Sequence, residues 1–82
     1  MFKKGDIVIC KDKFYGVTNI NCVCKVINVY KERIVVTPVK YLDEHRKNDN
    51  TYKNLINKET FTVQTKHFIK YNEYSNKDYN LF

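Results

Sequence analysis

The sequence predicts a mainly β fold, a small five-stranded and partly open barrel with a long insertion between the third and fourth strands. The first observation is a set of short apolar stretches rich in β-branched residues, near 6–10, 22–30, 33–38, 60–64 and 68–71. The second is the length of 82 residues, which excludes large multidomain folds. A flat sheet of five such strands would leave two edges and one apolar face exposed, so we expect it to roll up.

The first two predicted strands are apolar on both faces. Ile7–Cys10 is an uninterrupted apolar run, and residues 22–30 form the longest strand signal. Strands of this kind fit a position shared between two packed half-sheets. Alternation slips at Val26 and Ile27, where two neighbours are both apolar, and this predicts a β-bulge.

The third predicted strand returns from a short polar turn at residues 31–33. Pro38 cannot donate a backbone hydrogen bond, so it predicts a strand end or a sheet edge. Further along, strict alternation places Phe61 and Val63 inward. Residues 65–67 are predicted to form a tight turn before the last strand.

Residues 39–59 are too long for an ordinary hairpin loop. Asn50 or Thr51 is placed to cap a short helix. The insertion carries apolar anchors that either clamp the barrel or face a protein partner, and as protein-binding residues we name Tyr41, Leu42, Tyr52, Leu55 and Ile56.

The domain is expected to span residues 1–71, followed by a polar, flexible tail at 72–82. No run approaches the ~20 apolar residues of a membrane-spanning helix, so no membrane partner is expected. The first residues lack the apolar stretch of a signal peptide, which indicates a cytoplasmic protein.

Three cysteines, an odd number, fit a reducing compartment. Cys22 and Cys24 share one face of their strand. With Cys10 and a histidine they would make four zinc ligands, but the usual spacing is missing, so we interpret them as small buried hydrophobes and expect no metal or cofactor.

Catalytic residues are not predicted, and the chain is not expected to be an enzyme. Asp43, Glu44 and His45 place two carboxylates beside an imidazole, but consecutive residues project in different directions, so we interpret them as solvated surface. Only Gly5 and Gly16 are present, which excludes a glycine-rich phosphate loop.

Basic residues exceed acidic ones, giving a formal charge of +6. Lysine outnumbers arginine 13 to 2, which AT-rich coding would also produce. Aromatics interleave with these cations in the first half of the chain, and of these we interpret Phe14 and Tyr30 as core or strand-filling residues. A nucleic-acid-binding barrel is therefore one hypothesis, with site residues Lys11, Lys13, Tyr15, Lys25, Lys31, Arg33 and Lys40.

Three segments carry a family resemblance: Phe2-x-x-Gly5-Asp6-x-Val8-x-Cys10, Cys24-x-Val26, and Phe61-x-Val63-x(4)-Phe68. They resemble a loose family of small phage-encoded proteins with a barrel like that of Src-homology-three, Tudor and KOW domains. The resemblance covers residues 2–71 and implies a fold and an accessory, non-catalytic role. It transfers no binding residue.

Together these features favour a binding protein as the leading hypothesis. The resemblance and the aromatic-bearing insertion predict a phage or mobile-element accessory factor. Such a factor would bind a host protein complex and inhibit or modulate it, for example a defence nuclease such as a CRISPR effector. The nucleic-acid-binding barrel is the alternative.

Overall fold

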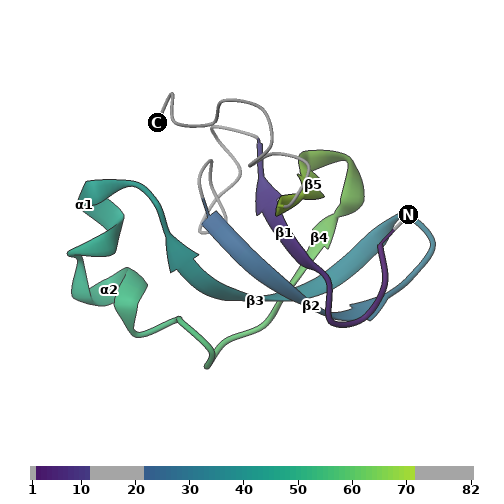
Figure 1. Cartoon of the computed structure of the whole chain (residues 1–82). Coiled ribbons are helices and arrows are strands. Elements are labelled where there is room, and N and C mark those ends of the chain that lie inside the picture. The colour runs from purple at the N-terminus through teal and green to yellow at the C-terminus, as the bar shows by residue number, and fades with distance from the viewer. Residues whose placement is uncertain (1, 12–21, 72–82) are drawn as a thin grey trace.

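Antiparallel strands form the centre of the molecule (Figure 1). The computed structural model describes residues 2–11 and 22–71. Within them the strands are β1 (Ile7–Cys10), β2 (Cys22–Val29), β3 (Arg33–Tyr41), β4 (Phe61–Gln64) and β5 (Phe68–Lys70). A 3-10 helix, η2 (Thr65–His67), joins β4 to β5. The predicted strands are confirmed to within a few residues at each end.

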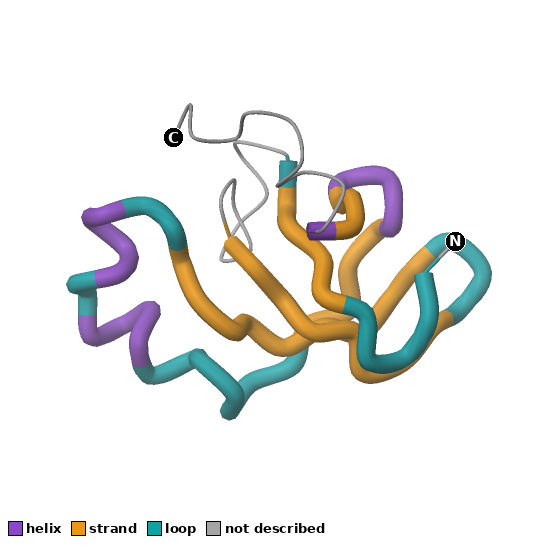
Figure 2. Tube along the Cα trace, in the orientation of Figure 1, coloured by secondary structure: helices purple, strands orange, loops and turns teal. Residues whose placement is uncertain are grey.

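The strand order is β4-β3-β2-β1-β5, with every neighbouring pair antiparallel. Strands β1 to β4 follow one another across the sheet, and the chain then returns to place β5 beside β1. The sheet is strongly curled, as the strand tube shows (Figure 2). Because β4 and β5 end the sheet without pairing with each other, the predicted mainly β, partly open barrel is confirmed.

The predicted bulge lies where alternation slips. The register of β2 on β3 shifts between Val26 and Asn28, so Ile27 is the extra residue. Its side chain is 41% exposed, as expected for a residue displaced from the inward pattern. A second shift lies between Val23 and Cys24, opposite Lys40 and Pro38, and the sequence did not predict it.

Pro38 does not end its strand, because β3 continues to Tyr41. The alternative prediction, a sheet edge, describes its surroundings. Strand β4 pairs only with Arg33 to Val36 of β3, so in the described residues that side of β3 has no partner strand from residue 37 onward. A proline is tolerated at such an edge since no ladder bond on that side is lost.

The core lies on one face of the curled sheet. Its buried members are Val8, Cys10, Cys22, Cys24, Val26, Ile34, Val36, Tyr41, Val63 and Phe68. Phe61 packs against this cluster, which confirms that Phe61 and Val63 point inward. Ile9 and Val23 lie outside the cluster but are also buried, so β1 and β2 bury both faces as predicted.

The insertion forms two short helices, α1 (Glu44–Lys47) and α2 (Asn50–Lys53), beside the end of β3 (Figure 1). A helix near Asn50 was predicted, but its cap is Asp49, whose carboxylate accepts a hydrogen bond from the Thr51 amide. Helix α1 was not predicted. Both helices are too short to cross a lipid bilayer, and no longer apolar helix exists among the described residues.

The cysteine thiols lie in the core as free thiols. The Sγ atoms of Cys22 and Cys24 are 3.5 Å apart, so their predicted position on one strand face is confirmed. The hydrogen bond with Cys22, followed by burial, raises the pKa of Cys24. Burial, and then the neighbouring Cys22, raises the pKa of Tyr41. Both groups are therefore held in their neutral forms.

Alkaline pH is expected to destabilise the fold. In the unfolded chain Cys24 and Tyr41 ionise near their ordinary pKa values of 9.0 and 10.0, but in the folded chain they keep their protons. The stability that they contribute is present below these unfolded pKa values and is lost as the pH rises, above about pH 9 for Cys24 and about pH 10 for Tyr41, at up to roughly 1.4 kcal/mol per pH unit for each group. Urea unfolding measured at about pH 7 and pH 10 should show a lower midpoint at the higher pH, whereas an unchanged midpoint would contradict this.

Candidate functional site

Two adjoining hollows lie at the end of the barrel away from α1 and α2. One has a volume of about 320 Å³ and is lined by Phe2, Val29, Tyr30, Lys31, Glu32, Thr65 and Lys66. The other, of about 240 Å³, is lined by Glu32, Arg33, Gln64, Thr65 and Lys66. They adjoin, because both are lined by Glu32, Thr65 and Lys66, and we call the two hollows together the end groove.

Backbone hydrogen bonds assemble the end groove from segments that are distant in the sequence. The β2–β3 turn is closed by the Tyr30 amide, which donates to the Arg33 carbonyl at 2.8 Å. The Thr65 amide donates to the Glu32 carbonyl at 3.1 Å, which ties η2 to that turn. Phe2 and Val29 are half-buried against the core and form an apolar floor. The groove is therefore a built feature of the fold.

Tyr30 is the one large aromatic side chain that is exposed in the described part of the chain, at 57%. Its interpretation as a core or strand-filling residue was therefore wrong. The hydroxyl oxygen of Tyr30 accepts a hydrogen bond from Asn28 Nδ2 at 3.0 Å, and Asn28 Oδ1 accepts one from the Val29 amide at 3.0 Å. The ring is thus presented to solvent but held in one orientation.

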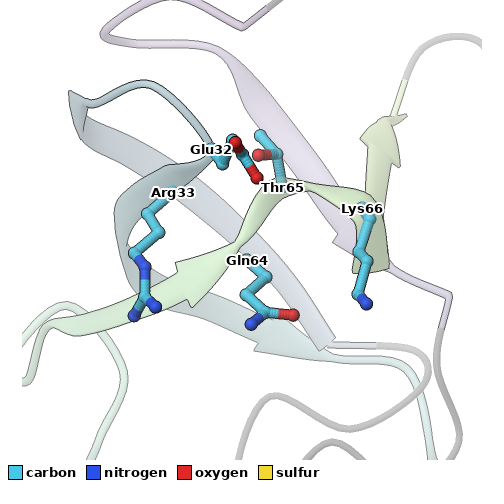
Figure 3. A pocket seen from close by; sticks show the side chains of 5 residues that line it. All are labelled: Glu32, Arg33, Gln64, Thr65 and Lys66. Atoms are coloured by element: carbon cyan, nitrogen blue, oxygen red, sulfur yellow. The ribbon is translucent and has the colours of Figure 1, made fainter.

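Cations dominate the rim of the groove. Arg33, Gln64 and Lys66 point the same way, while Glu32 and Thr65 lie together on the other side (Figure 3). The side chains of Lys31, Arg33 and Lys66 form no ion pair with another described residue. With three cations and one carboxylate, the rim attracts anions.

The structure brings together only part of the predicted nucleic-acid site. Lys31 and Arg33 lie on the end groove, where Lys66 joins them from η2. Lys25 is exposed further along β2, and Lys11 is exposed after β1. Lys40 is at the opposite end of β3 from Arg33, with its ammonium 5.6 Å from the Tyr71 ring centroid. The other two predicted residues, Lys13 and Tyr15, lie outside the described residues, as does Phe14.

Three of the predicted protein-binding residues pack on the barrel. Tyr41 is 3% exposed and belongs to the core, and Tyr52 and Ile56 pack against it. The Tyr41 and Tyr52 rings meet edge to face with centroids 5.2 Å apart. The sequence left open whether these anchors pack on the barrel or face a protein partner. Tyr41, Tyr52 and Ile56 pack on the barrel. Leu42 and Leu55 are half-buried, and their role in binding stays a prediction.

The carboxylates of Asp43 and Glu44 are engaged locally. Asp43 caps α1 by accepting from the His45 amide at 2.8 Å, and it pairs with Arg46 at 3.0 Å. Glu44 pairs with Lys47 at 3.1 Å. Within residues 2–11 and 22–71, no group of three or more cysteine, histidine or acidic side chains is placed to hold a metal ion.

Comparisons with known proteins give no further guide. No protein-family model, curated protein or solved structure matches this chain. The resemblance to small phage-encoded barrels therefore stays a prediction. The choice among functions depends on the geometry of the end groove.

Proposed function

We propose that this chain is a non-catalytic, nucleic-acid-binding small barrel and that the end groove is its binding surface. The observation that carries the proposal is that Lys31 and Lys66 line one hollow with the exposed Tyr30, while Arg33 lines the adjoining hollow. Lysine and arginine side chains follow a phosphate backbone, and an exposed aromatic ring stacks on a base. Isolated surface lysines would serve solubility alone, but here cations from the β2–β3 turn and η2 line two adjoining hollows.

The structure gives the protein-partner hypothesis less support than the sequence did, because the insertion presents few exposed apolar residues. The exposed large apolar residues among those described are Ile7, Ile27 and Tyr30, and none belongs to the insertion. Binding of a host protein by a phage accessory factor is therefore the second proposal. Of the predicted protein-binding residues in the insertion, only Leu42 and Leu55 remain candidates for that contact. Its test is a pull-down of host complexes with nuclease treatment as the control.

Binding to oligonucleotides is expected to weaken steeply with salt. Three phosphate contacts on a single strand give a slope of log affinity against log salt of about −2. The affinity should then fall roughly 20-fold between about 50 and 200 mM salt. Fluorescence anisotropy with a labelled oligonucleotide measures this directly, and no binding at about 50 mM salt would exclude the proposed function.

A charge-matched pair of double variants locates the site. Lys31→Gln with Lys66→Gln removes two charges from the end groove, while Lys53→Gln with Lys58→Gln removes two exposed charges from the insertion. Only the first should flatten the salt slope, to about −0.7. Equal effects of both variants would mean that binding follows net charge and not this groove.

A further inference from the structure

The end groove has an apolar compartment that phosphate binding alone does not use. Phe2 and Val29 form its floor, and Tyr30 adds an aromatic ring. A volume of about 320 Å³ lies near the lower limit of small-molecule pockets, which is ~300 Å³. This compartment suits a single flat ring better than a large ligand.

The aromatic ring of Tyr30 is oriented before any ligand arrives. Asn28 fixes the hydroxyl at 3.0 Å, and Asn28 is itself fixed to the Val29 amide. A ring already held in place loses little rotamer freedom when a flat group stacks on it, and this strengthens binding. Its exposure of 57% leaves ring surface open to such a group.

Cations border this aromatic compartment, as nucleotide binding requires. Lys31 and Lys66 rim the apolar hollow, and Arg33 and Gln64 line the hollow beside it. A nucleotide has the same order of groups, a flat base joined through a sugar to a charged phosphate. A base stacked at Tyr30 therefore leaves the adjoining phosphate near Lys31 and Lys66, which line the same hollow.

We propose that the end groove binds single-stranded nucleic acid by holding one unpaired base against Tyr30 over Phe2 and Val29. The adjoining phosphate lies at Lys31 and Lys66, which line the same hollow. The inference rests on the proposed function and narrows it from nucleic acid to single strands. In a duplex both faces of each internal base are already stacked on its neighbours, so a duplex offers phosphates but no free base face.

Substitution of Tyr30 separates stacking from charge. We expect Tyr30→Ala to weaken binding of an oligothymidylate of about 10 nucleotides by roughly 5- to 100-fold, with the salt slope unchanged. Tyr30→Phe keeps the ring and loses only the Asn28 hydrogen bond, so it should stay within about threefold of the parent protein. Circular dichroism of each variant checks that the barrel is still folded.

A second readout reports on the base itself. An oligonucleotide carrying one 2-aminopurine should change its fluorescence on binding the parent protein and Tyr30→Phe, but not Tyr30→Ala. A duplex of the same sequence should bind more weakly than the single strand. If duplex and single strand bind equally and Tyr30→Ala changes nothing, the inference is overturned while the proposed function stands.

Two other outcomes have different meanings. If no oligonucleotide binds at about 50 mM salt, the proposed function fails, and the inference fails with it. If a poly-glutamate peptide binds as tightly as the oligothymidylate and depends equally on Tyr30, the groove is a site for acidic peptides, which also overturns the inference. Lys53→Gln serves as the surface control in each assay, because Lys53 lies on α2, away from the groove.

Discussion

Tyr41→Ala is expected to remove ~3–5 kcal/mol from the free energy of unfolding, which is a large part of the stability of a small domain. The side chain is 3% exposed and lies in the core cluster, so its loss opens a cavity under the insertion. It also removes the edge-to-face contact with Tyr52 at 5.2 Å, one of the contacts between α2 and β3. Urea unfolding followed by circular dichroism measures the change.

The control for Tyr41 is its neighbour on the insertion. Tyr52 is only half-buried, so Tyr52→Ala should destabilise by clearly less, on the order of 1–2 kcal/mol. If Tyr41→Ala and Tyr52→Ala were both as stable as the parent protein, the insertion would not pack on the core. The comparison also separates loss of binding from loss of folding for any partner assigned to the insertion.

The second large effect concerns the chemical protection of the thiols. All three cysteines of the sequence are described, and each is at most 1% exposed. A thiol reagent needs an accessible thiolate, so reaction must wait for unfolding. We expect native thiols to react on the order of a thousandfold or more slowly than those in guanidinium chloride.

Release of chromophore from a disulfide reagent at about pH 8 follows this reaction. In denaturant three equivalents should react rapidly, while the native protein should show a slow phase only. One rapid equivalent in the native protein would mean that one side of the Cys10, Cys22 and Cys24 cluster opens to solvent. Tyr41→Ala provides an internal check, because its lower stability should accelerate the slow phase.

Local sequence patterns predicted the strands well, because β-branched composition and the alternation of apolar residues can be read from neighbouring residues alone. β-branched runs located the strands, and the slip at Val26 and Ile27 located the bulge. Pro38 misled the prediction of the third strand's end, since a proline is compatible with a strand wherever the partner is missing on one side. Nothing local in the sequence shows that β4 stops pairing at Val36.

The helices and the end groove were less predictable. Asp49 caps α2 in place of Asn50 or Thr51, a difference of one residue between equally suitable cap types. The groove combines Phe2, the turn after β2 and residues of η2, which meet only after the sheet has closed. Lys31 and Arg33 were named from the sequence, whereas Lys66 and the exposed ring of Tyr30 required the fold.

The unpaired side of β3 has a consequence for self-association. An open strand edge is a template for another chain, and such edges lead to aggregation unless they are covered. Here the Asn57 amide donates to the Pro38 carbonyl at 2.8 Å, and Pro38 itself has no amide to offer. Asn57 holds a left-handed backbone with φ of 57°, which asparagine tolerates better than most residues. The insertion therefore covers this part of the open edge, and we expect that deleting it would expose β3 to pairing with another chain.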